Sequence, residues 1–249
     1  LLQKHVSGVE VAIGAFFNGN DFSQPVYINF EHKRMFNGEI GPSTGEMGTS
    51  AFWSEPNKLF NETLFKMKEA LAASKYVGYI DINTIANSRG IYPLEFTSRF
   101  GYPTISLQIE GITSKFGEML HNLANGTMTK IQTKKGFQVC VVVAVPPFPF
   151  DDPRAFKRYS EEATVMFKKA NIDGVHPGDV KIIEGDWTLA GNRGYALITT
   201  GSGGTMEEAR KQAYARVKNI MIPNMFYRTD IGVRWYFDSD KLQTWGYLY

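Results

Sequence analysis

The sequence predicts an α+β protein in two units, an antiparallel sheet with helices over residues 1–128 and a smaller α/β domain over residues 129–249. Three observations lead to this fold class. The first half holds two pairs of β-rich runs, each pair joined by a short turn. The second half begins with a long apolar run and contains a well-marked amphipathic helix. Between the halves, residues 129–135 are polar and lack apolar periodicity, so we place the domain boundary there.

Two β-hairpins dominate the predicted first unit. Val, Ile, Phe and Tyr recur in four runs, and turn residues such as Asn-Gly-Asn-Asp separate the two runs of each pair. The predicted strands are residues 9–17 and 24–31 in the first hairpin, and residues 76–86 and 91–96 in the second.

The rest of the first unit is expected to be two helices and a long loop. Apolar spacing predicts helices over residues 58–74 and 105–125. Residues 37–50 are rich in Gly, Ser and Thr and include a proline, so we expect an extended loop there. A loop of this length in a compact domain is usually functional.

The predicted second unit alternates strands and helices. Its best-marked helix covers residues 206–220, with Thr205 as the N-cap and Glu207 and Glu208 in the first turn. The other predicted elements are a buried strand at residues 136–145, a helix at 153–170, and short strands at 180–184 and 195–200.

Composition excludes several classes of protein. The net charge is +2 and 21% of residues are charged, which gives no broad attraction to nucleic acid or to a membrane surface. No apolar run approaches the ~20 residues that span a bilayer. Cys140 is the single cysteine, so an internal disulfide is impossible, and its apolar surroundings predict an inert buried thiol. We therefore expect a cytoplasmic protein, and the start at Leu1 suggests a fragment or a processed chain.

The second hairpin carries polar side chains in an alternating pattern. Residues two apart share a face of a strand, so Asp81 and Asn83 point the same way, as do Glu95, Thr97 and Arg99. Such oxygens suit a hard cation such as Mg²⁺, and an arginine beside them suits a phosphate or carboxylate. From these residues alone, an ordinary hairpin with one solvated face is the favoured alternative.

A basic cluster lies just ahead of the glycine-rich segment. His32, Lys33 and Arg34 precede the glycine-punctuated run 41–48, and glycines allow backbone amides to approach an anion closely. The spacing is not that of a Walker A loop. A phosphate-binding loop and a solvated surface turn are equally favoured. The glycines at 201–204 more often indicate a tight turn before a helix than an anion site.

In this order, these pieces resemble the phosphoribosylamine–glycine ligase family. The chain has Gly-Val-Glu at residues 8–10 for a G-E-E-like step, E-H-K-R at 31–34 for D-H-K-R, and G-P-S-T-G-E-M-G at 41–48 for G-P-N-T-G-G-M-G. The motif L-E-F-N-x-R-F-G-D-P-E appears at residues 94–104 as L-E-F-T-S-R-F-G-Y-P-T. The G-x-T-x-E-E-A and Y-R-x-D-I-G motifs of the family's last domain match residues 203–209 and 227–232.

The resemblance implies an ATP-grasp fold, in which two lobes clamp ATP and Mg²⁺ (or Mn²⁺) bridges its phosphates. This chain would supply the carboxyl-terminal lobe and the small last domain. The implied reaction belongs to de novo purine synthesis and joins an amino acid to an amine through an acyl phosphate, with glycine and phosphoribosylamine as substrates. The implied partner is the missing amino-terminal part of the same ligase, so this chain alone is expected not to turn over ATP.

The resemblance also implies roles for individual residues. The implied metal ligands are Glu95 and Thr97, with Asn83 beside them. The residues implied to contact the reacting phosphate are Arg99, Lys33 and Arg34. Those implied to line ATP and the substrates are Glu10, His32, Gly41, Thr44 and Gly45.

The sequence also departs from the family motifs at the implied site. Thr97 replaces an Asn, Tyr102 and Thr104 replace an Asp and a Glu, and Ser43 and Glu46 change the glycine-rich segment. Two alternatives follow from these changes. One is a divergent ATP-grasp ligase with another amine or carboxylate, and the other is a non-catalytic binding module with the same fold.

Overall fold

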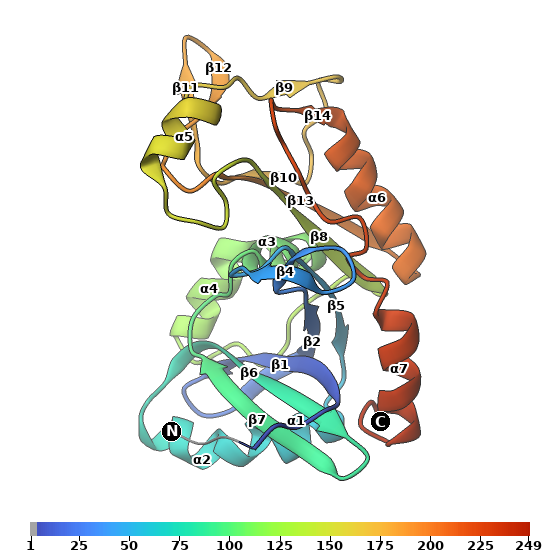
Figure 1. Ribbon diagram of the computed structural model, residues 1–249. Coiled ribbons are helices and arrows are strands. Elements are labelled where there is room, and N and C mark those ends of the chain that lie inside the picture. The colour runs from blue at the N-terminus through green and yellow to red at the C-terminus, as the bar shows by residue number, and fades with distance from the viewer. Residues whose placement is uncertain (1–3) are drawn as a thin grey trace.

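The computed structural model describes residues 4–249, and one antiparallel sheet of eight strands organises them (Figure 1). The strand order is β10-β13-β8-β5-β2-β1-β6-β7, and every neighbouring pair is antiparallel. The strands are β1 Val9–Asn18, β2 Phe22–Glu31, β5 Gly48–Ser54, β6 Val77–Asn87, β7 Gly90–Thr97, β8 Phe137–Ala144, β10 Val175–Pro177 and β13 Tyr195–Gly203.

The sheet runs across the expected domain boundary. Strand β8, from the second predicted unit, pairs with β5 from the first, with Cys140 opposite Thr49. The division at residues 128 and 129 stays a prediction, but both sides of it contribute to the same sheet. Cys140 is fully buried at this junction, and burial raises the pKa of its thiol well above the usual value, as expected for an inert thiol.

Both predicted hairpins are confirmed. Strands β1 and β2 pair through the Asn18 turn, where the Asn18 side-chain oxygen accepts hydrogen bonds from the backbone amides of Asn20 and Asp21. Strands β6 and β7 pair across the turn that ends at Gly90. Local turn chemistry and alternating burial point to the same arrangement, so short-range rules were sufficient here.

The expected loop at residues 37–50 is wrong over half of its length. It contains part of a small hairpin, β3 Arg34–Phe36 with β4 Ile40–Ser43, and its last residues belong to β5. Gly41 has φ +85° and lies so close to the Phe36 ring that an added Cβ would be 2.6 Å from it. This glycine therefore permits a tight turn.

Three predicted helices are shorter than expected. Residues 58–74 form α1 Lys58–Glu62, a 3₁₀ turn at Leu64–Met67 and α2 Lys68–Ala73, because Thr63 leaves the helical conformation. Residues 105–125 form α3 Thr104–Gly111 and α4 Phe116–Ala124, because the chain is extended at Ile112, which bridges to Thr133. Helix α5 Pro153–Tyr159 ends at Ser160, far before residue 170.

The helix at the end of the glycine run is confirmed. Helix α6 Met206–Asn219 begins with a capping box between Thr205 and Glu208. Helix α7 Trp235–Thr244 had no counterpart in the sequence prediction. The remaining short strands are β9 Met166–Phe167, β11 Val180–Ile183, β12 Asp186–Leu189 and β14 Ile220–Met221.

The two faces of the sheet are covered differently. Helices α1, α2, α6 and α7 pack over one face, and Trp235 of α7 contacts the apolar clusters at both ends of it. Helices α3 and α4 cover the other face, with Leu107 of α3 against Tyr27 and Cys140. Polar residues of β2, β6 and β7 remain beside the start of α3, which positions the candidate site. No helix within residues 4–249 is long and apolar enough to cross a membrane.

Candidate active site

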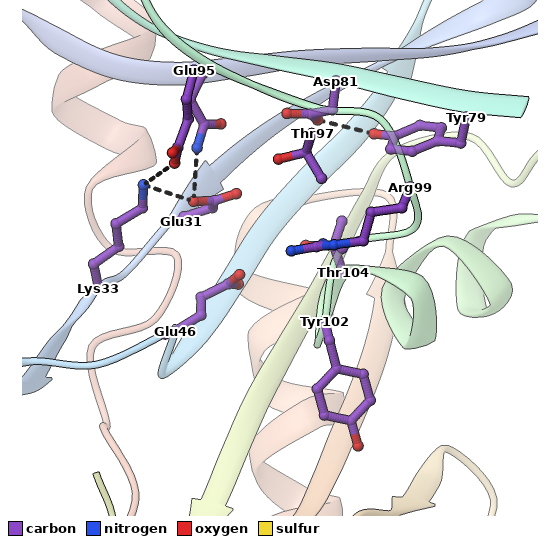
Figure 2. A pocket seen from close by; sticks show the side chains of 13 residues that line it. Glu31, Lys33, Glu46, Tyr79, Asp81, Glu95, Thr97, Arg99, Tyr102 and Thr104 are labelled. Carbon is purple, nitrogen blue, oxygen red and sulfur yellow. Dashed lines mark hydrogen bonds and ion pairs between the residues drawn. The ribbon is translucent and has the colours of Figure 1, made fainter. Parts of the chain in front are cut away.

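The polar residues of the second hairpin share one face of the sheet, as the alternation predicts. Asp81 lies opposite Thr97, and Asn83 lies opposite Glu95. Together with residues of β2, of the segment before β5 and of the start of α3, they line a cavity of about 170 Å³ (Figure 2). Its lining residues are Glu31, Lys33, Gly45, Glu46, Tyr79, Asp81, Asn83, Glu95, Thr97, Arg99, Gly101, Tyr102 and Thr104.

Lys33 joins three carboxylates at one side of this cavity. Its Nζ lies 3.3 Å from carboxylate oxygens of Glu10 and Glu31 and 3.8 Å from Glu95. Partial burial disfavours the charge on Lys33, but Glu31 and Glu10 outweigh it and raise the pKa of Lys33 above its usual value. Lys33 is therefore a fixed positive charge at the edge of the cavity.

Two further carboxylates lie deeper. Asp81 accepts hydrogen bonds of 3.0 Å from the Tyr79 hydroxyl and from the Asn29 amide. Burial and the negative charge of Glu31 raise the pKa of Asp81 to about 7, despite these two bonds. Burial, and then Glu31, raises the pKa of Glu46 well above its usual value. The cavity thus crowds four carboxyl groups around two cations, and a positive ligand would relieve the repulsion that helps to raise the pKa of Asp81 and of Glu46.

The donor set suits a magnesium-like ion bound by few protein ligands. Asn83 donates its amide to Glu31 at 3.3 Å, and its buried Oδ1 has no hydrogen-bond partner in the described chain. The Glu95 side chain is 66% exposed and lines the cavity. In residues 4–249 no three His, Cys, Asp or Glu side chains converge as a complete metal cage. A cation here would complete its shell with phosphate oxygens and water, as Mg²⁺ prefers.

Arg99 extends its guanidinium toward the centre of the cavity (Figure 2). It donates to the Phe100 carbonyl at 2.9 Å and otherwise faces the open space. With Lys33, Arg99 gives the cavity two cations on different sides, which suits a phosphate held between them. Helix α3 also begins at Thr104 on the cavity wall, and a helix N-terminus favours an anion.

His32 lies outside the cavity, although it is next to Lys33. It is fully buried, its Nε2 accepts from the Gly232 amide at 3.3 Å, and its Nδ1 lies 2.9 Å from Glu39. Burial and then the charges of Arg228 and Arg234 lower the pKa of His32, although Glu39 opposes them. A neutral His32 therefore joins the first hairpin to the carboxyl-terminal segment.

The other predicted residues are divided between the cavity and its surroundings. Gly45 lines the cavity, and Glu10 reaches it only through Lys33. Arg34 points away and donates to the Gly41 carbonyl at 3.1 Å. Neither Arg34 nor Gly41 lines the cavity. Thr44 donates its hydroxyl and its amide to the Lys33 carbonyl, at 2.9 and 2.7 Å, and so fixes the backbone of Lys33.

A second and larger cavity of about 560 Å³ adjoins the first. Its lining residues are Ser43, Thr44, Gly45, Glu46, Tyr102, Phe148, Pro149, Gly178, Asp179, Arg193 and Tyr195. Sequence reasoning missed this cavity because Tyr195 and Asp179 are far from residue 46 in the chain. It also left Glu31 and Glu46 out of the site, although both belong to the motifs that were identified.

The comparisons with known proteins agree with this architecture. A model described as "Phosphoribosylglycinamide synthetase, ATP-grasp (A) domain" matches residues 1–105, and one described as the "C domain" of the same family matches residues 138–234. The phosphoribosylamine–glycine ligase of Streptococcus pneumoniae strain R6 is 30% identical over 246 residues, which cover 91% of this chain and 56% of that protein.

Solved structures show the same fold. The phosphoribosylamine–glycine ligase of Thermotoga maritima superposes with a TM-score of 0.71 at 22% identity, covering 92% of this chain and 56% of that one. The biotin carboxylase subunit of a pyruvate carboxylase gives a TM-score of 0.52 at 10% identity, covering 96% and 51%.

The fold is therefore that of the ATP-grasp class of proteins. Two models of one family match most of the chain, one after the other and in the order of its predicted motifs. The chain belongs to the phosphoribosylglycinamide synthetase family. It spans a little over half the length of the curated relatives that it matches.

Proposed function

We propose that this chain is part of an ATP-dependent ligase that joins a carboxylate to an amine, with glycine and phosphoribosylamine as the first pair of substrates to test. The observation that carries the proposal is the first cavity. It combines Lys33 and Arg99, which suit anionic oxygens, with the Asn83 and Glu95 oxygens, which suit a hard cation. Family membership supports the ligase class of reaction.

Glu95, Asn83 and Thr97 would hold Mg²⁺ (or Mn²⁺), which when bound neutralises charge on the nucleotide phosphates. Lys33 would keep Glu31 and Glu95 oriented and balance part of their charge. Arg99 would bind oxygens of the transferred phosphoryl group. These residues position and stabilise charge, which supplies most of the acceleration in phosphoryl transfer.

The proposed reaction has two steps. A carboxylate oxygen of the first substrate attacks the γ-phosphorus of ATP, the bond to the bridging oxygen breaks, and ADP leaves with the electron pair. The amine nitrogen of the second substrate then attacks the carbonyl carbon of the acyl phosphate. Phosphate leaves, the nitrogen loses a proton, and an amide remains.

The rest of the ligase, amino-terminal to these residues, is proposed to complete the nucleotide site. The first cavity, at about 170 Å³, has room for phosphate groups and a metal ion but not for a whole nucleotide. The chain also covers 56% of its curated relatives. The adenosine-binding residues are therefore expected outside this chain.

A divergent ligase with another amine is the second candidate. Tyr102 and Thr104 line the first cavity where the family motif has two carboxylic acids, so the substrate beside the metal position faces a different surface. A screen of amines with fixed glycine separates this candidate from the first.

The test is ADP formation by the full-length protein with Mg²⁺, ATP, glycine and phosphoribosylamine, compared with the 249-residue chain alone. We expect steady turnover from the full-length protein and none from the chain. ADP formation by the chain alone would contradict the proposed division of the site. Mg-ATP binding by the full-length protein without turnover, whatever the amine, would instead indicate a non-catalytic binding module.

A further inference from the structure

The second cavity has the size and the walls of a small-molecule site. Its volume of about 560 Å³ lies well inside the range of ligand pockets. The ring centroids of Tyr102 and Tyr195 lie 5.1 Å apart with an angle of 40° between their planes, and the Phe148 ring lies 5.7 Å from that of Tyr195. These aromatic faces would pack against a ring-shaped ligand.

The two cavities share a wall. Gly45, Glu46 and Tyr102 line both of them. Figure 2 shows the Glu46 carboxylate pointing toward the centre of the first cavity, whereas the Tyr102 ring points away from it. A molecule whose body lies against Tyr102 in the second cavity therefore presents one end to the first cavity beside Glu46.

Glu46 lacks the partner that its burial demands. Only 5% of the residue is exposed, and its Oε1 is buried with no hydrogen-bond partner among residues 4–249. The Tyr195 hydroxyl, on the second-cavity side, is likewise buried and without a partner in the described structure. Burying such groups is unfavourable unless a ligand or water completes them. An N–H donor at this wall would satisfy the Glu46 oxygen.

The second cavity also contains a cation, Arg193, together with the carboxyl group of Asp179. Arg193 lines it and is mostly exposed, with a 3.3 Å contact to Asp151 at the surface. A ligand that bears an anionic group at the end away from its amine would place that group near Arg193. The cavity thus offers an acceptor at its inner end, aromatic walls along its length and a cation at its mouth.

We propose that the second cavity binds the amine substrate of the ligase, a primary amine on a ring-bearing body, and that Glu46 accepts a hydrogen bond from the attacking amine. This inference rests on the proposed ligase function. Glu46 stands where the family motif has a glycine, and Tyr102 where it has an aspartate. The shared wall therefore has one carboxyl group, as the family motif does. In this chain the group is on the segment before β5, whereas in the motif it is on the segment before α3.

The experiment separates the two chemical steps in the full-length protein. Hydroxylamine is a small nucleophile that can trap the acyl phosphate of glycine without filling the second cavity. In Glu46→Met, we expect the KM for phosphoribosylamine to rise about tenfold to a hundredfold, as for a lost hydrogen bond to a buried acceptor, and hydroxamate formation to fall by a much smaller factor. Glu46→Gln keeps an acceptor oxygen and is expected to recover part of the affinity.

Two controls keep the result interpretable. Tyr195→Phe keeps the aromatic wall and loses only the hydroxyl, so its KM should rise less than that of Glu46→Met. Thermal unfolding of Glu46→Met should be no easier than that of wild type, because an unpaired buried carboxylate is removed. Phenethylamine in place of phosphoribosylamine then tests whether an aromatic amine or a sugar phosphate is the better occupant.

The outcomes distinguish the inference from the proposed function. An unchanged KM for both amines in Glu46→Met would overturn the inference while leaving the ligase intact. Equal loss of hydroxamate and amide would also overturn it, because Glu46 would then serve the first step. Absence of both products from the wild-type protein would refute the ligase itself. Equilibrium binding of phenethylamine would still test the inference about the second cavity. Equal affinity of wild type and Glu46→Met for phenethylamine would overturn that inference.

Discussion

His32 and Lys33 are neighbours in the sequence, yet their side chains enter two different charged clusters. Among the described residues, one cluster contains polar atoms without partners, and in the other the polar groups bond one another. Lys33 faces the first cavity, where carboxylates outnumber cations and Asn83 Oδ1 lacks a partner in the described chain. His32 faces a buried cluster with Glu39 and Arg228, in which the polar groups bond one another.

Arg228 completes the second cluster. Only 1% of it is exposed, and it donates to Glu39 at 2.7 Å, to Asp230 at 2.8 Å and to the Arg34 carbonyl at 2.9 Å. A cluster whose groups satisfy one another stabilises the fold, whereas a cluster with orphaned atoms around a cavity is prepared for a ligand. The difference between the clusters leads to three predictions.

The largest expected effect is on catalysis at the first cluster. In the full-length protein, Glu95→Gln should lower kcat/KM by roughly 10³-fold, because a ligand of the proposed metal is lost. Its free energy of unfolding should change by less than about 0.5 kcal/mol, since Glu95 is largely exposed. Steady-state kinetics and urea unfolding provide the two measurements.

A matched carboxylate outside both clusters is the control. Glu110 bonds Lys134 at 2.9 Å and Arg216 at 3.0 Å, away from the cavities. Glu110→Gln should therefore lower stability and leave kcat/KM near that of wild type. Equal kcat/KM in Glu95→Gln and wild type would remove Glu95 from the proposed site.

The second expected effect is on stability at the His32 cluster. Arg228→Met should lower the free energy of unfolding by about 2–4 kcal/mol, because Glu39 and Asp230 lose a buried cation. Arg193→Met, at the exposed pair with Asp151, should lower it by no more than about 1 kcal/mol. Similar urea midpoints for the two variants would show that the Arg228 cluster contributes no more than a surface pair.

The smallest effect is a difference in acid sensitivity. Bonding to His32 and Arg228 overcomes burial and lowers the pKa of Glu39 to about 2, and Arg228 likewise lowers the pKa of Asp230. A lowered folded-state pKa stabilises the fold above the unfolded-state pKa, and this stabilisation is lost as the pH falls. Wild type should therefore lose more stability than Arg228→Met between about pH 4.5 and 2. Parallel curves of unfolding free energy against pH would contradict this assignment.

The sequence predicts what short-range physics determines. The β6–β7 hairpin follows from its turn and from alternation, and the common face of Asn83 and Glu95 follows with it. Helix α6 follows from its capping box. The breaks at Thr63 and Ile112 do not, because apolar periodicity continues through both positions and packing decides where each helix ends.

The rest of the site depends on contacts that no local pattern encodes. His32 meets Arg228, which lies 196 residues further along the chain, so an E-H-K-R motif cannot indicate which of its members faces a ligand. Glu46 and Tyr195 meet only because β8 brings the two halves of the sheet together. Arg34 and Gly41 illustrate the same limit, since both belong to matched motifs and neither reaches the cavity.

The pairing of β5 with β8 also has a consequence for cutting the chain into two fragments. A cut between residues 128 and 129 would separate these strands and expose the backbone of both, with Thr49 and Cys140 no longer covered by a neighbour. Unpaired, apolar strand edges of this kind recruit other chains and promote aggregation. The two matched family segments follow one another in sequence, and in this protein one continuous sheet joins them.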